Sequence, residues 1–177
     1  MRNFKHFMLV VMVGSLLNLT SCSSDDDGGG SGNAGAGTIV AKVDGASFES
    51  LEISSGATIA NGGLNLIMIG TNIDAQGFSL AISGYDGVGS YSIGGGTNIF
   101  NTVSYTETMV NLDNPTASTT EVWSAPYNDQ VVGELRVSEQ TETTITGTFE
   151  FTCKNPTDDS IKTVTEGSFN LEFDIIN

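Results

Sequence analysis

The sequence predicts a single all-β domain over residues 38–177, built as an antiparallel β-sandwich of about ten strands, with a β-barrel as the alternative. Apolar and polar residues alternate in several segments, which is the period of a strand with one buried face. Asp-Gly, Asn-Gly and Gly-Gly pairs separate these segments, as tight antiparallel turns require. The sandwich ranks first because one-faced and two-faced strands both occur, whereas a closed barrel favours more uniform strands.

The clearest alternation lies in the last third of the chain. In segment 144–153 the odd positions are apolar or glycine and the even positions are Thr or Glu, and segment 168–175 alternates in the same way. One Gly-x-Phe motif lies in the first segment, at Gly147, and another begins just before the second, at Gly167, and we interpret the two segments as adjacent strands of one hairpin. Segment 64–69 is apolar on both faces, which predicts a central strand. Further strands are expected at 39–43, 78–82, 99–105, 119–125 and 133–137.

The turn residues agree with an antiparallel fold. Asp44-Gly45 follows the first expected strand, and this pair readily adopts the positive φ angles of a type I′ hairpin turn. Glycine-containing turns recur later in the chain, and Asn-Pro pairs at 114–115 and 155–156 mark looser turns. The intervals between strands are too short for the crossovers of about a dozen residues that a parallel sheet needs.

The N-terminus has the order of a secretory signal. Arg2 and Lys5 precede the apolar run 7–17, which is too short to span a bilayer that needs about 20 apolar residues. Leu-Thr-Ser at 19–21 follows the run and stands directly before Cys22, and this context resembles the bacterial lipobox, in which the cysteine thiol receives a diacylglycerol. We therefore expect a signal peptide over residues 1–21 and a lipid anchor on Cys22, which attaches the protein to a membrane.

Residues 22–37 form the expected tether between the lipid and the domain. The segment is rich in glycine and has no apolar residue larger than alanine beyond Cys22, so it cannot bury a core. A coil of this length has a root-mean-square reach of about 20 Å. Ser24, Asp25, Asp26 and Asp27 follow the cysteine closely, where surface lipoproteins of the Bacteroidetes often carry an acidic export signal, and the run resembles that element.

The domain itself resembles small Bacteroidetes lipoproteins of unknown function. The similarity rests on segments 41–48, 89–93, 145–151 and 166–171, which begin with the Asp-Gly hairpin and end with the second Gly-x-Phe motif. The resemblance implies a β domain and an outer-membrane location, on the cell surface or the periplasmic face, and it carries no catalytic residue. The triplet at 159–161 also resembles the O-glycosylation site of exported Bacteroidetes proteins, which makes Ser160 a candidate acceptor.

Charge and composition narrow the function classes. Loss of residues 1–21 removes two of six cations and no acids, so the mature chain carries 4 − 21 = −17. Such a charge disfavours nucleic acid as a partner. The sole histidine, His6, leaves with the signal peptide, so the mature domain lacks the commonest general base and metal ligand. We predict no enzyme activity, no cofactor and no metal site. Cys153 has no disulfide partner and is expected to be a buried core residue.

The leading functional hypothesis is a non-catalytic lipoprotein with a structural or binding role at the outer membrane. The alternative is carbohydrate binding, with Trp123 and Tyr127 as a platform on which sugars stack. Against the platform, the single tryptophan of a small domain usually packs in the core, and we favour that interpretation for Trp123. The partner could thus be a glycan or another envelope protein, and the sequence leaves the oligomeric state open.

Overall fold

The computed structural model describes residues 33–96 and 98–174, and it confirms the all-β antiparallel class. The signal peptide, Cys22 and the acidic run at Ser24–Asp27 lie outside these residues. No helix among the described residues has the length and apolar character to cross a membrane. The strands are β1 Thr38–Val43, β2 Ala46–Glu49, β3 Ser55–Ala60, β4 Asn65–Thr71, β5 Gln76–Ser83, β6 Gly89–Gly94, β7 Thr102–Met109, β8 Thr119–Ala125, β9 Val131–Gln140, β10 Thr144–Lys154 and β11 Ile161–Glu172.

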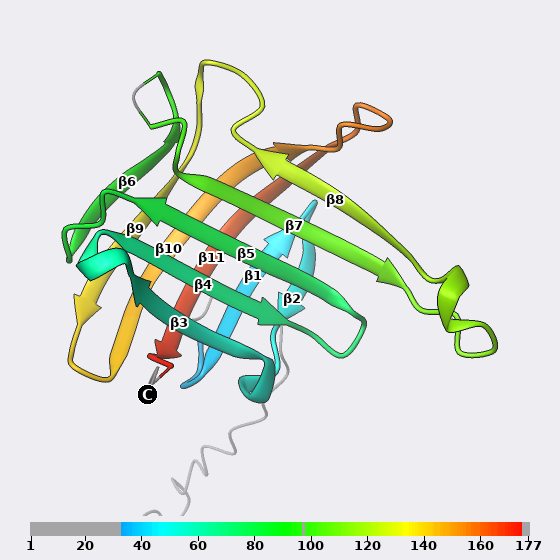
Figure 1. Ribbon diagram of the computed structural model, residues 1–177, viewed down its shortest axis with the longest axis horizontal. Helices are drawn as coiled ribbons and strands as arrows, with labels where there is room; N and C mark the ends of the chain where they lie inside the picture. The colour runs from blue at the N-terminus through cyan, green and yellow to red at the C-terminus, as the bar shows by residue number, and fades with distance from the viewer. Residues whose placement is uncertain (1–32, 97, 175–177) are drawn as a thin grey trace, which may run out of the picture.

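The strands form one connected sheet in the order β2-β1-β11-β10-β8-β7-β5-β4-β3, which curls into a half-barrel (Figure 1). The sheet branches at β10, which pairs with β9 along most of its length and with β8 only at its end, and β6 pairs with β9. A parallel bridge joins Ala57 on the edge strand β3 to Phe173, just after β11. The fold is therefore an open, curled sheet, intermediate between a β-sandwich and a closed barrel.

The core lies inside this curl, where the inward positions of most strands meet. The fully buried large side chains include Tyr105, Phe169, Ile39, Leu66, Met68, Leu80, Ile82, Ile93, Leu135, Ile145, Leu171 and Val103. Strands β10 and β11 pair from Thr144–Glu172 to Lys154–Ile161, so the predicted hairpin of the two Gly-x-Phe strands is confirmed. Their alternation places one apolar face on this core.

The predicted Asp-Gly turn joins β1 to β2. Asp44 has φ 50° and Gly45 has φ 84°, as a type I′ turn requires. The turn is also fixed to β11, because Asp44 N donates to Thr163 O at 2.8 Å and Thr163 N donates to Asp44 Oδ1 at 2.8 Å. The sequence therefore predicts the turn itself, and the fold adds its contact with a distant strand.

The prediction of a strand at 99–105 is wrong for its first three residues, because β7 begins at Thr102. Asn101 is buried just before it, where its Oδ1 accepts from Ser83 N at 2.9 Å and its Nδ2 donates to Ser92 O at 2.9 Å. These two bonds hold residue 101 in a turn, which leaves Phe100 72% exposed. The local apolar run could not reveal these bonds, because both partners lie on other strands.

Segment 64–69 forms most of β4, which pairs with β3 and β5. The strand is thus flanked on both sides, but one of its two apolar faces is not covered: Ile67 is 39% exposed and Ile69 is 50% exposed. Its other face, with Leu66 and Met68, lies in the core. An apolar strand therefore occurs here without the second buried face that this pattern usually indicates.

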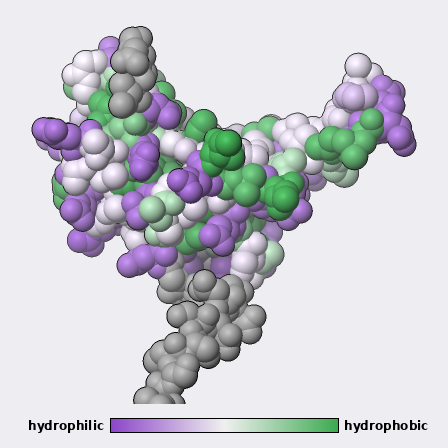
Figure 2. All heavy atoms as spheres, turned by 90° about the horizontal axis from the view of Figure 1, so that it is seen from below, coloured by the Kyte–Doolittle hydropathy of each residue, from purple (hydrophilic) through white to green (hydrophobic). Residues whose placement is uncertain are grey.

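A long hairpin of β7 and β8 projects from the body (Figure 1). Its strands pair as far as Met109 and Thr119, and the connection carries the exposed apolar residues Val110 and Leu112. Figure 2 shows apolar atoms on this projection, away from the rest of the molecule. These side chains lie beyond the reach of the core.

Candidate functional site

Trp123 and Tyr127 do not form one exposed platform. Trp123 is 4% exposed and packs in the core, opposite Tyr105 on β7. Tyr127 lies beyond the end of β8 and is 38% exposed, with its hydroxyl 3.0 Å from Thr152 Oγ1. Thr152 alternates with the buried residues of β10 and therefore faces outward. The two rings belong to opposite sides of the sheet, so the structure corrects the platform hypothesis and agrees with a core position for Trp123.

Ser160, the candidate glycan acceptor, contacts Trp123 directly. The indole Nε1 of Trp123 donates to Ser160 Oγ at 2.8 Å, and Ser160 N donates to Asp158 Oδ1 at 2.9 Å. Hydrogen bonding from the Ser160 hydroxyl, and then from the Ser160 backbone N–H, lowers the pKa of the Asp158 carboxyl. Ser160 is half-buried just before β11. A glycan on this hydroxyl would therefore have to accommodate the indole as a neighbour.

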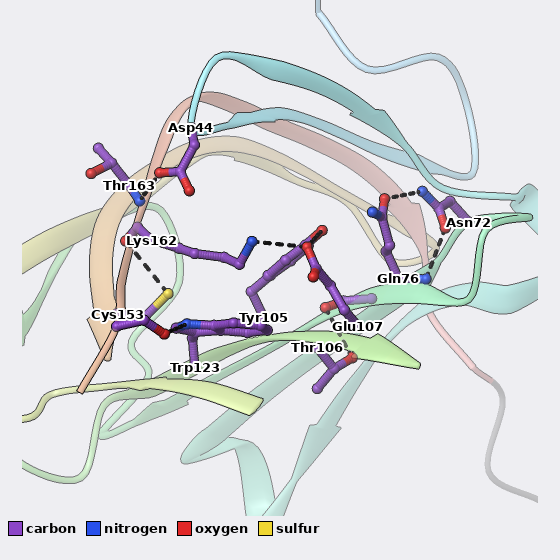
Figure 3. Close-up of polar contacts among 12 residues, drawn as sticks. Asp44, Asn72, Gln76, Tyr105, Thr106, Glu107, Trp123, Cys153, Lys162 and Thr163 are labelled. Carbon is purple, nitrogen blue, oxygen red and sulfur yellow. Dashed lines mark hydrogen bonds and ion pairs between the residues drawn. The ribbon is translucent and has the colours of Figure 1, made fainter. Parts of the chain in front are cut away.

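A polar cluster at one end of the curl joins β11 to β7 and β8 (Figure 3). Lys162 Nζ lies 2.9 Å from Glu107 Oε1, and Tyr105 OH donates to the same oxygen at 3.0 Å. The ammonium also lies 4.5 Å from the centre of the Trp123 ring and 5.5 Å from that of Tyr105. Burial, followed by the Glu107 charge, raises the pKa of Tyr105. We call Lys162, Glu107, Tyr105 and Trp123 the cation cluster.

The cation cluster is better suited to stability than to binding. Strands β11 and β7 are not neighbours in the sheet, so the Lys162–Glu107 pair connects its two walls. The described residues contain no buried side-chain nitrogen or oxygen without a hydrogen-bond partner. The charges of Lys162 and Glu107 are thus paired with each other within the cluster.

Cys153 lies beside this cluster and is fully buried, as the sequence predicts. Its Sγ is 3.7 Å from the carbonyl oxygen of Lys162. Burial and then the Asp44 charge raise the pKa of the thiol to about 12. Because the thiolate is the nucleophilic form, this cysteine is not suited to catalysis.

A polar cleft lies over β9, β10 and β11 and is the candidate binding site. A cavity of about 360 Å³ is lined by Asn33, Glu134, Arg136, Thr148, Phe149, Glu150, Glu166, Gly167 and Ser168. An adjoining cavity of about 440 Å³ shares Glu134 and Glu150 and extends along Thr152, Thr163 and Thr165. Because Tyr127 contacts Thr152, its exposed ring stands beside this second cavity. We call the two cavities together the outer cleft.

A β-bulge shapes the outer cleft. Phe149 pairs with Gly167 and Phe151 pairs with Val164, so β11 has one more residue than β10 in this interval. The extra length is taken up around Glu166, whose φ is 52°. Bulges bend a strand and redirect side chains. Here the Glu166 carboxylate is directed to Lys42 on β1, with Nζ–Oε2 at 3.0 Å.

Arg136 distinguishes the outer cleft electrostatically. Among the cations in residues 33–96 and 98–174, all three lysines form ion pairs, whereas Arg136 has none within 4.0 Å. Glu134 and Glu150 stand directly opposite each other on β9 and β10, which is an unfavourable pair of like charges. The cleft therefore offers guanidinium donors beside carboxylate and hydroxyl oxygens. This set suits a polar ligand with many hydroxyl groups better than a simple anion.

Sequence reasoning missed Arg136, Glu134 and Glu150. Arg136 could have been noticed as the single arginine of residues 22–177. Glu134 precedes it by two residues on β9, but its proximity to Glu150 depends on the β9–β10 register, which no local pattern contains. The described residues hold no group of three or more His, Cys, Asp or Glu side chains arranged to bind a metal ion.

Comparison with known proteins identifies one protein family that matches the chain. Residues 36–171, more than half of the chain, match the family described as "Domain of unknown function (DUF6252)". The match covers all of the strands except the last residue of β11 and includes the residues that line the outer cleft apart from Asn33. No curated protein and no solved structure matches the chain.

Proposed function

The chain belongs to the DUF6252 family, whose description leaves the role open, and we propose that it is a non-catalytic lipoprotein, anchored to the outer membrane, with a structural or binding role. The observation that carries this proposal is the cysteine at position 22, directly after Leu-Thr-Ser and a short apolar run. A diacylglycerol there holds the domain at a membrane, because two buried acyl chains give stable anchoring.

The start of the described chain supports a close connection between anchor and domain. Residues 33–37 belong to the predicted tether, yet Ala34 N donates to Ser168 Oγ at 2.8 Å and Gly37 N donates to Asn170 O at 2.7 Å. This part of the tether is therefore packed on β11. Cys22 then lies eleven residues before Asn33, which corresponds to about 37 Å of extended chain.

The side chains support a role without catalysis. The mature sequence has no histidine, and its cysteine thiol beyond the anchor is buried with a raised pKa. The strongest polar cluster, around Lys162, is internally paired. General acid–base and nucleophilic mechanisms usually require an accessible group with a suitable pKa.

The anchor is tested by substituting its cysteine. Cys22→Ala should abolish labelling with a radioactive or clickable fatty acid and release the protein from the membrane fraction of its native host. Cys153→Ala is the matched control, and its labelling should equal that of the unsubstituted protein. A Cys22→Ala chain that stays with the membrane would overturn the proposal. Protease accessibility on intact cells, with Asp25–Asp27 replaced by alanine, tests surface display.

Glycan binding is the second candidate, and the outer cleft favours it. The exposed Tyr127 ring beside Thr152, together with Arg136 and the two facing glutamates, supplies a stacking surface and hydrogen-bonding groups. A glycan array probed with the Cys22→Ala chain, which lacks the anchor, tests this candidate, and any glycan that binds is then titrated. Arg136→Ala and Tyr127→Ala should each weaken binding about tenfold, while Lys154→Ala should leave it unchanged. Equal binding by all three variants would exclude the cleft.

A further inference from the structure

Exposed aliphatic side chains gather around η1 (Glu52–Ser54), the outer face of β4 and the turn that follows it. Ile53 is 95% exposed and Ile73 is 84% exposed, and Leu51, Ile67 and Ile69 are 43%, 39% and 50% exposed. Single exposed apolar residues are ordinary, whereas a contiguous group marks an interaction surface. Figure 2 shows apolar atoms gathered in the middle of the face on this side of the molecule. We call these five residues the aliphatic face.

Hydrogen bonds fix the members of the aliphatic face beside one another. The carbonyl of Thr71, at the end of β4, accepts from Leu51 N at 2.9 Å and from Ser54 Oγ at 2.7 Å, so η1 is held against the end of β4. The turn with Ile73 follows at once and is closed by Asn72 N donating to Gln76 O at 2.9 Å. The face is therefore held in a defined conformation.

Among the described residues, no lysine or arginine borders the aliphatic face. On the outer face of β5, Ser79 and Ala81 stand opposite Ile69 and Ile67. On the β3 side, Thr58 stands opposite Ile67 and donates to Asp174 at 3.3 Å. Glu52 and Asp74 are further exposed acids at the margin. An apolar centre with acidic margins does not attract an anionic surface.

The position of the N-terminal segment indicates what covers this face. Asn33 lines the outer cleft, and four residues later Gly37 lines a cavity of about 500 Å³ together with Leu51, Glu52 and Ile53, so the chain passes beside η1. Because residues 34–37 are held on β11, the tether runs from Cys22 to Asn33, eleven residues with an extended reach of about 37 Å. A lipid on Cys22 therefore keeps a bilayer within reach of the aliphatic face.

We infer that the aliphatic face docks on the surface of a zwitterionic phospholipid bilayer, an inference that rests on the proposed lipid anchor. Leu51, Ile53 and Ile73 enter the interfacial region first, and β4 follows with Ile69 and Ile67. The tether raises the local concentration of the face at the membrane, so a contact that is weak on its own becomes populated. The acidic margins make the contact weaker on anionic membranes.

An environment-sensitive NBD label on a new cysteine tests the contact. Ile53→Cys and Ile73→Cys are labelled in the full lipidated chain, where Cys22 is acylated and Cys153 is buried, and are reconstituted in phosphatidylcholine vesicles. We expect a blue shift, a severalfold rise in emission and quenching by spin-labelled lipid. Leu112→Cys, on the projecting hairpin, is the matched control and should stay water-like. The shift should shrink when phosphatidylglycerol replaces part of the phosphatidylcholine.

The outcomes separate the anchor from the docking. If the protein floats with vesicles but the labels at 53 and 73 stay water-like, the docking inference is wrong and the anchor stands. If no lipid is found on Cys22, the same NBD labels are placed in the Cys22→Ala chain, which is titrated with concentrated vesicles. A blue shift of the emission that Ile69→Glu removes supports the docking inference, and the absence of a blue shift refutes it. A shift without lipid that grows with protein concentration assigns the face to a second copy and overturns the inference.

Discussion

The ring of Phe169 lies over Gly147 across the β10–β11 pair, and a Cβ built on Gly147 would be 2.5 Å from Phe169 Cζ. The relation is reciprocal, because Phe149 stands opposite Gly167, where a Cβ would be 2.6 Å from Phe149 Cδ2. The two rings stack at 6.5 Å between centres. In an antiparallel pair, two Gly-x-Phe motifs in this register place each phenylalanine over the other strand's glycine.

Gly147→Ala should therefore destabilise the domain. The new methyl group would meet the Phe169 ring and also the Arg136 carbonyl oxygen, 2.0 Å away on β9, so backbone as well as side chain must move. Overpacking of this kind costs about 2–3 kcal/mol, which urea unfolding followed by fluorescence would measure. Gly35→Ala is the control, because its Cβ would meet only Thr38 Oγ1 at 3.6 Å. An equal midpoint for both variants would contradict the interlocking.

The Lys162–Glu107 pair should contribute measurably to stability. Its side chains are 18% and 34% exposed, so solvent screens the attraction in part, and we expect a coupling of about 1 kcal/mol in a double-mutant cycle. The cycle uses Lys162→Met and Glu107→Gln, which keep the side-chain length. The Lys154–Asp159 pair, with Asp159 80% exposed, serves as the comparison and should show a coupling near zero. A larger coupling in the exposed pair would refute the assignment.

Stability should fall at alkaline pH. Burial raises the pKa of Cys153 from 9.0 to about 12 and that of Tyr85 from 10.0 to about 12. Between these values the unfolded chain releases protons that the folded chain retains, so the free energy of unfolding decreases as pH rises from about 9 to about 12. Unfolding midpoints measured across this interval check the sign. In Cys153→Ala the free energy of unfolding should decrease less steeply with pH. An unchanged slope against pH would contradict a raised pKa of Cys153.

The Cys153 thiol should also react slowly with DTNB at pH 8 in the folded protein. The thiolate is scarce at this pH and the sulfur is fully buried, so labelling requires local opening. Labelling in urea should be fast and complete. Rapid labelling of the folded chain would show that the sulfur is accessible.

Asp44→Ala should lower the free energy of unfolding more than Asp44→Asn does. The Asp44 residue has φ 50°, which asparagine tolerates better than alanine, and its Oδ1 accepts from Thr163 N at 2.8 Å. Asparagine keeps an acceptor oxygen, whereas alanine removes it and leaves the donor without its partner. We expect a loss of about 1–2 kcal/mol for alanine and less than half of that for asparagine by urea unfolding. Equal losses would show that the side-chain bond contributes little.

The sequence by itself determined the local features of this protein. The period of two predicted β10 and β11, and the two Gly-x-Phe motifs predicted that they pair. Asp44-Gly45 predicted the first hairpin, because its conformational preference is local. The burial of Cys153 followed from the phase of the same alternation.

The tertiary structure decided which faces are covered and which distant residues meet. Alternation shows that residues share a face, but whether another element covers that face depends on the path of the whole sheet, and so Ile67 and Ile69 of β4 are exposed. The contact between Trp123 and Ser160 and the alignment of Arg136 with Thr148 require strands to meet in one register. Such pairings are fixed by long-range packing, which no local pattern encodes.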